Sequence, residues 1–185
     1  MKIYTIIGGV NGVGKSSFTG ALKAQPHNNL GVIIDVDKIT AENGGDLIQG
    51  GKQAVQEINR CLENGYSFTQ ETTLSGIKTA KTIRAAKDKG YFIRLYYIGL
   101  DTLEESLARI RNRVQKGGHA IDSGSVERRF DARFDALLSI LPYCDEAFLF
   151  DNQNGFVKVA EYSNGEIVPL TRQIPPWLET LLAYK

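Results

Sequence analysis

The sequence predicts an α/β fold in which a five-stranded parallel sheet lies between two layers of helices. Short apolar runs alternate with helical stretches along the chain, a pattern typical of parallel strands joined by crossover helices. A glycine-rich motif separates the first apolar run from the first helix, where sheets of this kind bind ligands. The 185 residues are enough for one domain with a complete core.

The predicted parallel strands are runs of β-branched and aromatic residues. They occupy residues 2–8, 31–35, 66–71, 91–99 and 146–150. The helices are expected at residues 16–24, 53–64, 76–89, from 102 to a glycine-rich break at 117–124, and at 125–141. Gly90 is the expected C-cap of the helix before it, Thr102 and Glu105 form a capping box, and Pro142 ends the last helix.

The pattern changes after residue 155. Two short strands, at residues 156–162 and 166–170, flank Asn164-Gly165, which predicts a β-hairpin with a type I′ turn. Two prolines then precede a short terminal helix. We expect residues 156–185 to be an appendage of the domain formed by residues 1–155, and not a second domain.

The charge balance excludes some classes of function. Lys and Arg total 22 and Asp and Glu total 21, so no overall basic field attracts nucleic acid. No apolar run approaches the roughly 20 residues that a membrane helix needs, and the N-terminal run is too short for a signal peptide. Cys61 and Cys144 are expected to be reduced, buried thiols. These observations predict a cytoplasmic protein with no nucleic acid and no membrane as partner.

Residues 9–16, Gly-Val-Asn-Gly-Val-Gly-Lys-Ser, match the phosphate-binding P-loop pattern G-x-x-x-x-G-K-[ST], and they lie between a predicted strand and a predicted helix. The backbone N–H groups of such a loop surround a phosphate, the lysine reaches the β- and γ-phosphates, and the serine hydroxyl binds Mg²⁺. The pattern does not choose between ATP and GTP. The residues expected to bind the nucleotide here are Gly9, Asn11, Gly12, Val13, Gly14, Lys15, Ser16 and Ser17.

Carboxylates and hydroxyls follow the next two predicted strands: Asp35 and Asp37, then Glu71, Thr72 and Thr73. One of the two aspartates is expected near the metal, where it could also accept the proton of an acceptor hydroxyl. Asp37 is favoured because it lies beyond the strand end, although either aspartate could instead cap a helix. Glu71 either contacts a substrate hydroxyl or is an edge carboxylate, and the two threonines are ligands or caps.

Arginines flank the glycine-rich break. The helix before it carries Arg109, Arg111 and Arg113, and the helix after it carries Arg128, Arg129 and Arg133. This arrangement predicts a lid, at about residues 114–128, whose arginines close over phosphates. The alternative is a solvated helix face with intrahelical pairs such as Glu105–Arg109. His119, inside the break, is either a substrate contact or an exposed loop residue.

The order of these motifs resembles the zeta-toxin-like P-loop kinases, and in particular their short branch described as predicted ATPases. The resemblance spans residues 1–155. Its motifs are residues 9–16, Asp35-Val36-Asp37, Glu71-Thr72-Thr73-Leu74-Ser75-Gly76, residues 113–119, Arg128-Arg129-Phe130 and Asp151-Asn152.

The resemblance implies an adenylate-kinase-like three-layer sandwich that uses ATP and Mg²⁺ to phosphorylate a hydroxyl of a small molecule. Toxin members phosphorylate UDP-N-acetylglucosamine, so a UDP-sugar is the implied acceptor. By the same resemblance, Lys15 and Ser16 are implied to bind phosphate and magnesium, Asp37 to be the general base, and Glu71 to bind substrate. It also implies phosphate binding for Arg113 with Arg128 or Arg129, and the adenine loop for Asp151 and Asn152.

The chain departs from the toxin members in two places. Its first strand begins at residue 2, so the N-terminal segment through which toxins meet an antitoxin has no obvious counterpart, and Lys38 follows the acidic pair. Two other functions compete with the kinase. One is a P-loop ATPase, because residues 74–76 are similar to the start of the transporter ATPase signature, without its continuation. The other is a nucleotide-binding module without turnover.

Overall fold

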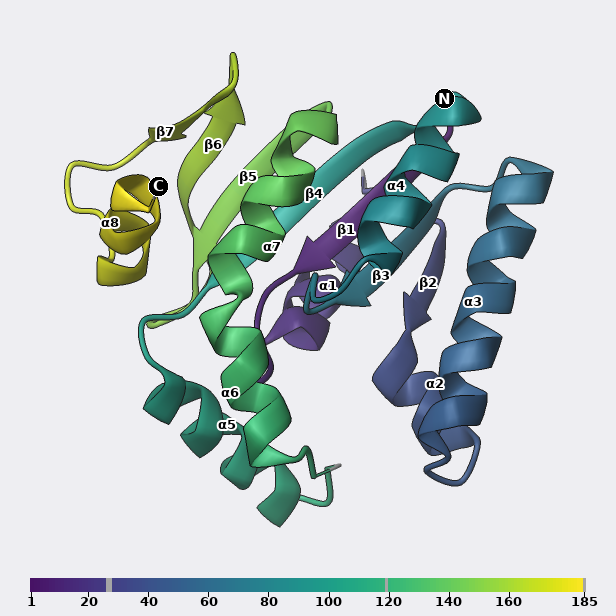
Figure 1. Ribbon diagram of the computed structural model, residues 1–185, viewed down its shortest axis with the longest axis horizontal. Helices are drawn as coiled ribbons and strands as arrows, with labels where there is room; N and C mark the ends of the chain where they lie inside the picture. Colours follow the sequence, from purple (N-terminus) through teal and green to yellow (C-terminus); the bar gives the residue numbers. More distant parts are fainter. Residues whose placement is uncertain (26–27, 119, 185) are drawn as a thin grey trace.

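The computed structural model describes residues 1–25, 28–118 and 120–184. Within these residues a seven-stranded sheet has the order β2-β3-β1-β4-β5-β6-β7 (Figure 1). The strands are β1 (Ile3–Gly8), β2 (Val32–Asp35), β3 (Phe68–Thr72), β4 (Phe92–Gly99), β5 (Glu146–Asp151), β6 (Val157–Ser163) and β7 (Glu166–Pro169). Because β1 pairs with β3 and β4, the strand that leads into the P-loop lies in the middle of the sheet.

The predicted sheet of five parallel strands is wrong in its extent and composition. The strands from β2 to β5 are parallel, but β6 pairs with β5, and β7 with β6, in antiparallel register, so the sheet is mixed. The hairpin turn has the positive φ angles of a type I′ turn, 54° at Asn164 and 86° at Gly165. The hairpin extends the sheet instead of projecting from it, because the edge of β5 would otherwise leave its backbone groups unpaired.

The helices are α1 (Lys15–Lys23), α2 (Val36–Glu42), α3 (Leu47–Asn64), α4 (Lys78–Asp88), α5 (Leu103–Gln115), α6 (Ser123–Asp131), α7 (Arg133–Ile140) and α8 (Pro176–Ala183), with a 3₁₀ turn at Leu141–Tyr143. Helix α2 was not expected from the sequence, and α6 and α7 were expected as a single helix. That helix breaks at Ala132, where the Arg133 side chain donates to the carbonyl of Phe130 (2.7 Å). None of the helices in the described ranges is long and apolar enough to cross a membrane.

The two faces of the sheet are covered unequally. Helices α3, α4, α7 and α8 contribute buried residues to the larger core, against alternate residues of β1, β4 and β5 such as Tyr4 and Leu95. Helix α1 packs on the opposite face, where Phe18 lies with Ile7 and Ile98 in a second cluster. Figure 1 shows α4 and α7 in front of the sheet and α1 behind it. The middle strands are therefore buried on both faces, which explains their continuous apolar runs.

The C-terminal helix is part of the core, although its sequence was not part of the family resemblance. Trp177, at its start, is 1% exposed and lies over Gly99, where a Cβ would come within 2.2 Å of the indole. Its backbone N–H donates to Asp101 and its indole N–H to Asp151, both at 2.9 Å. Helix α8 therefore fixes the loops that follow β4 and β5.

Candidate functional site

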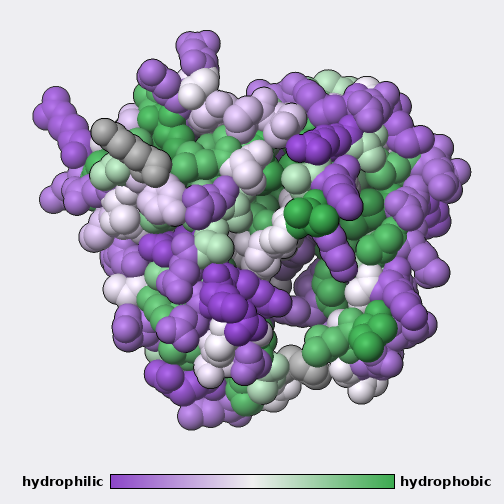
Figure 2. Space-filling model, viewed as in Figure 1, coloured by the Kyte–Doolittle hydropathy of each residue, from purple (hydrophilic) through white to green (hydrophobic). Residues whose placement is uncertain are grey.

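A cavity of about 1160 Å³ opens at the carboxyl ends of the parallel strands. Figure 2 shows the molecule hollowed where, in Figure 1, α2 and α3 face α5 and α6. The lining comes from the P-loop, the ends of β2 and β3, and helices α2 to α6. Its charged members are Lys15, Asp35, Asp37, Glu71, Lys78, Lys81, Arg109, Arg113, Lys116 and Arg129.

The P-loop is held in a shape that needs glycine. Gly12 has a φ of 75°, and a Cβ there would lie 2.8 Å from the Ser106 carbonyl of α5. Gly14 has a φ of 100°, and its Cβ would lie 2.7 Å from the Asn152 amide nitrogen. Because L-residues rarely adopt these angles, the predicted phosphate-loop glycines have a backbone reason for their positions.

The Lys15 ammonium lies inside the P-loop and donates to the carbonyls of Gly9 (3.0 Å) and Val10 (3.1 Å). Burial lowers the pKa of Lys15, while the carboxylates of Glu71, Asp37 and Asp35 act in the opposite direction. Only loop carbonyls are hydrogen-bonded to this ammonium in the described residues. An anionic phosphate would bind it more strongly than these neutral oxygens do.

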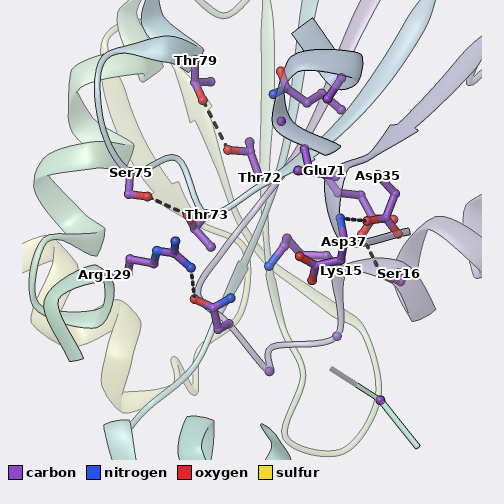
Figure 3. A pocket seen from close by; sticks show the side chains of 18 of the residues that line it. Lys15, Ser16, Asp35, Asp37, Glu71, Thr72, Thr73, Ser75, Thr79 and Arg129 are labelled. Atoms are coloured by element: carbon purple, nitrogen blue, oxygen red, sulfur yellow. Dashed lines mark hydrogen bonds between the residues drawn. The ribbon is translucent and has the colours of Figure 1, made fainter. Parts of the chain in front are cut away.

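Glu71 lies against the first turns of α1 (Figure 3). Its two carboxylate oxygens accept from the hydroxyls of Ser16 (2.7 Å) and Thr19 (2.6 Å), and the residue is 8% exposed. Burial raises the pKa of Glu71, and the two hydroxyl hydrogen bonds partly oppose this. Because the Ser16 proton points to Glu71, the lone pairs of the Ser16 oxygen are available to a cation. The sequence left Glu71 as either a substrate contact or an edge carboxylate, the family resemblance implied substrate binding, and no pattern marked Thr19.

The two aspartates after β2 have different surroundings. The Asp35 carboxylate accepts from the backbone N–H groups of Asp37 (3.0 Å) and Lys38 (3.2 Å), so Asp35 is the N-cap of α2. Asp37, in the first turn, has a side chain that is 67% exposed, and its Oδ2 lies 3.7 Å from Nη1 of Arg113. Both residues line the cavity. The capping alternative therefore holds for Asp35, which leaves Asp37 as the carboxylate directed toward Arg113.

The two threonines after Glu71 shape the loop between β3 and α4. The Thr72 hydroxyl accepts from the Leu74 backbone N–H (3.0 Å) and lies 3.3 Å from the Thr79 hydroxyl. The Thr73 hydroxyl lies 2.8 Å from that of Ser75. Both threonines line the cavity, so they combine a loop contact with a position beside a ligand.

The arginines that the sequence analysis grouped together are separated by the structure. Arg113 and Arg129 line the cavity, whereas the Arg128 guanidinium donates to Ser125 one turn earlier in its own helix and lies outside the lining. Arg133 stacks on Phe130 and Phe134, with its guanidinium carbon 3.8 and 4.1 Å from the ring centroids. His119 lies outside the described residues.

The predicted adenine loop lies beside the P-loop. Arg109 holds this loop, a contact that the sequence did not predict. The Asn152 side chain donates to the Val13 carbonyl (2.8 Å), while the Asp151 carboxylate is held by Trp177. Arg109 pairs with Glu105 (2.5 Å) and also donates to the Asn152 carbonyl (2.7 Å). The Glu105–Arg109 spacing was visible in the sequence, but the second contact depends on tertiary packing.

Gln70 is a second residue that the sequence analysis missed. It is 9% exposed and lines the cavity near α3, which contributes Gly51, Ala54, Val55 and Ile58 to the same wall. The hydroxyl of Tyr4 donates to Gln70 Oε1, and burial raises the pKa of Tyr4 so that it keeps this proton. The amide nitrogen is then the group that Gln70 can offer to a ligand. Alternation along β3 places residue 70 on this face, but no local signal marks it as functional.

Comparisons with known proteins identify a family and a set of structures with a similar fold. The model of a protein family described as zeta toxin matches residues 49–161. The chain belongs to the zeta toxin family. The match begins after the P-loop, so the phosphate site of this zeta toxin family member rests on its own sequence and structure. An uncharacterized protein of Haemophilus influenzae is 32% identical over 127 residues, covering 66% of this chain and 88% of that protein.

Solved structures share the fold of this family member. The PezAT toxin–antitoxin system of Streptococcus pneumoniae has a TM-score of 0.62 and 20% identity, covering 85% of this chain and 71% of that chain. The AvrRxo1-ORF1:ORF2 complex with ATP has a TM-score of 0.68 and 17% identity, covering 98% of this chain and 64% of that chain. The Pnkp1/Rnl/Hen1 RNA repair complex has a TM-score of 0.59 and 17% identity, covering 75% and 46%. At these identities the likeness concerns the fold alone.

Proposed function

We propose that this zeta toxin family member is an ATP-dependent kinase that transfers the γ-phosphate to a hydroxyl of a small molecule. The observation that carries the proposal is the convergence of a phosphate loop, an acidic residue and two arginines on one cavity: Lys15, Asp37, Arg113 and Arg129 all line it. Phosphoryl transfer depends mainly on positioning and on charge stabilisation, and these groups can supply both. Residues 1–155 would form the catalytic core, with the hairpin and α8 as its support.

ATP fits the residues present. The ammonium of Lys15 and the backbone of the P-loop would hold the phosphates, with Asn152 beside the loop and Arg109 holding Asn152. The AvrRxo1 complex with ATP supports the choice of adenine nucleotide. Mg²⁺ fits the Ser16 oxygen, whose proton is directed to Glu71. When bound, the metal would neutralise charge on the transferred phosphate.

The proposed general base is Asp37. Its exposed carboxylate faces the cavity, so it can accept the proton of an acceptor hydroxyl as the new O–P bond forms. Arg113, which lies beside Asp37, would stabilise the charge of the transferred group together with Arg129. In this proposal Glu71 orients the Ser16 hydroxyl toward the metal, and Asp35 caps the N-terminus of α2.

The acceptor would occupy the part of the cavity between α3 and α4. Apolar residues of α3 line one side, Lys78 and Lys81 of α4 the other, and Gln70 the floor. An acceptor with anionic groups fits these lysines, and a UDP-sugar such as UDP-N-acetylglucosamine meets that requirement. A simple ATPase needs no such second compartment, which favours the kinase over that alternative.

The neighbour from S. pneumoniae belongs to a toxin–antitoxin system, which supports a search for a protein inhibitor of this chain. No contact among the described residues identifies a binding surface for such an inhibitor.

Release of ADP from Mg-ATP, with and without a panel of nucleotide sugars and nucleosides, tests the proposal. We expect release that depends on an acceptor and is lost in Lys15→Ala, because Lys15 is the cation inside the loop. Equal release without any acceptor would indicate an ATPase. Nucleotide binding with no release under any condition would indicate a binding module.

A further inference from the structure

Two helices of the cavity wall meet the P-loop at one residue, Asn11. The Ser106 hydroxyl of α5 donates to the Asn11 carbonyl (2.7 Å), and Nη1 of Arg129, from α6, donates to the side-chain oxygen Oδ1 of Asn11 (3.1 Å). Figure 3 shows the Arg129 side chain reaching from its helix to this contact. Asn11 is 6% exposed and Ser106 is fully buried, so the hydrogen bond between them is shielded from water, whereas the one from Arg129 is partly buried at the cavity wall.

The contact of Arg129 differs in charge from those of the other cavity arginines. Arg109 pairs with the Glu105 carboxylate at 2.5 Å, and Arg113 lies 3.7 Å from the Asp37 carboxylate. The Arg129 guanidinium instead donates to a neutral amide oxygen. A phosphate adds charge–charge attraction and can accept two hydrogen bonds from one guanidinium, so a phosphate would displace Asn11 from Arg129.

We infer that Asn11 is a positioning residue that holds Arg129 beside the P-loop and releases it to the γ-phosphate of the bound nucleotide. The inference rests on the proposed function. It assigns a role to the Asn11 side chain, whereas the P-loop pattern predicts only that the Asn11 backbone surrounds a phosphate. The exchange involves hydrogen bonds alone. Without Asn11, the Arg129 side chain must be ordered when the nucleotide binds, which costs conformational entropy. With Asn11, this side chain is already ordered in the folded protein before binding.

The inference predicts a selective effect on the γ-phosphate. With Mg²⁺ present, binding of ADP is compared with binding of the non-hydrolysable ATP analogue AMPPNP by titration calorimetry. Arg129→Ala should weaken AMPPNP binding by about tenfold or more, since it loses a charge-assisted contact. Asn11→Ala should weaken it by about threefold to tenfold, since only the ordering of Arg129 is lost. Neither variant should change ADP binding by more than about twofold.

The double variant separates positioning from packing. If Asn11 acts through Arg129, Asn11→Ala should have no further effect in the Arg129→Ala background. Arg128→Ala is the matched control, because it removes the neighbouring arginine, which bonds within its own helix. Ser106→Ala removes the other contact of Asn11 and reports on loop shape. Asn11→Leu, closer to asparagine in shape, replaces Asn11→Ala if the latter does not fold.

Three results would overturn the inference. Equal weakening of ADP and AMPPNP by the Asn11 variants would show that Asn11 only shapes the loop. Additive effects of Asn11→Ala and Arg129→Ala would show that the two residues act separately. A wild-type protein that binds neither nucleotide would remove the proposed function itself, and this inference with it.

Discussion

Asp35 and Asp37 are separated by one residue, yet their side chains have different partners. The Asp35 carboxylate binds the first backbone N–H groups of α2, whereas Asp37 extends into the cavity toward Arg113. A capping carboxylate is occupied by the backbone, so it is poorly placed to accept a substrate proton. At the scale of single residues, helix capping therefore belongs to Asp35, and the proposed proton transfer to Asp37.

Replacement of each aspartate by asparagine tests this separation. Asp37→Asn should lower phosphate transfer by about 100-fold or more while nucleotide binding persists, because a general base contributes on that order. Asp35→Asn should keep most activity, because asparagine caps helices as well as aspartate does. Steady-state rates and calorimetric ADP binding provide the measurements. Equal losses in the two variants would contradict the assignment.

Glu71 holds a charge in a poorly solvated place beside Ser16 and Thr19. Because burial raises its pKa above the ordinary 4.5, the folded protein binds this proton more tightly than the unfolded chain does. The resulting stability is present below pH 4.5 and is lost as the pH rises through the folded-state pKa. Above that pKa, the buried charge of Glu71 therefore lowers the stability of the folded protein.

Glu71→Gln should melt at a higher temperature than the wild type at about pH 8, and the gap should narrow as the pH is lowered toward the ordinary pKa of glutamate. The same variant should lose metal-dependent turnover, since Ser16 loses its charged partner. Glu63→Gln, at an exposed position of α3, is the matched control and should change neither property. A gap in melting temperature that is constant across pH would contradict the role of the Glu71 charge.

Among the elements, α8 connects the C-terminal segment to the nucleotide side of the molecule. Trp177 is fully buried over Gly99 and binds both Asp101 and Asp151, the residues that follow β4 and end β5. These loops lead into α5 and into the proposed adenine loop. The terminal helix therefore holds the loops after β4 and β5, and none of its described residues lines the cavity.

Trp177→Ala should lower the free energy of unfolding by about 3–5 kcal/mol, the usual cost of truncating a large buried aromatic side chain. Urea titration measures this, and ADP affinity should fall as well, because Asp151 loses the indole N–H. Leu182→Ala, in the same helix at a position that is 42% exposed, should cost less than about 1 kcal/mol. Similar losses in both variants would show that α8 is not anchored by Trp177.

At the scale of the whole molecule, the features that depend on local sequence patterns were predicted, and those that depend on nonlocal contacts were not. The P-loop, the parallel strands and the type I′ turn depend on short-range signals, and each was predicted. The pairing of β6 with β5 was not, because a strand pattern does not say which edge it joins. The break at Ala132 was also missed, because alanine favours helix and no local signal marks the break.

The candidate site shows the same limit. The P-loop, Asp37 and Glu71 could be predicted, since ligands bind at the carboxyl ends of parallel strands, but Thr19 and Gln70 could not. The contact between Glu71 and Ser16 could not, because it follows from β3 lying beside β1. Adjacent positions on a helix face directions about 100° apart, so only the packing of α6 separates Arg129 from Arg128.

The central claim is that this cavity transfers a phosphoryl group from ATP to a small molecule. Mass spectrometry of acceptors incubated with the protein and Mg-ATP tests it most directly, with UDP-N-acetylglucosamine among the acceptors and Lys15→Ala as the control. The account predicts a product about 80 mass units heavier than one acceptor, as addition of a phosphoryl group requires, and absent in the control. ATP bound by the wild type with no phosphorylated acceptor anywhere in the panel would contradict it.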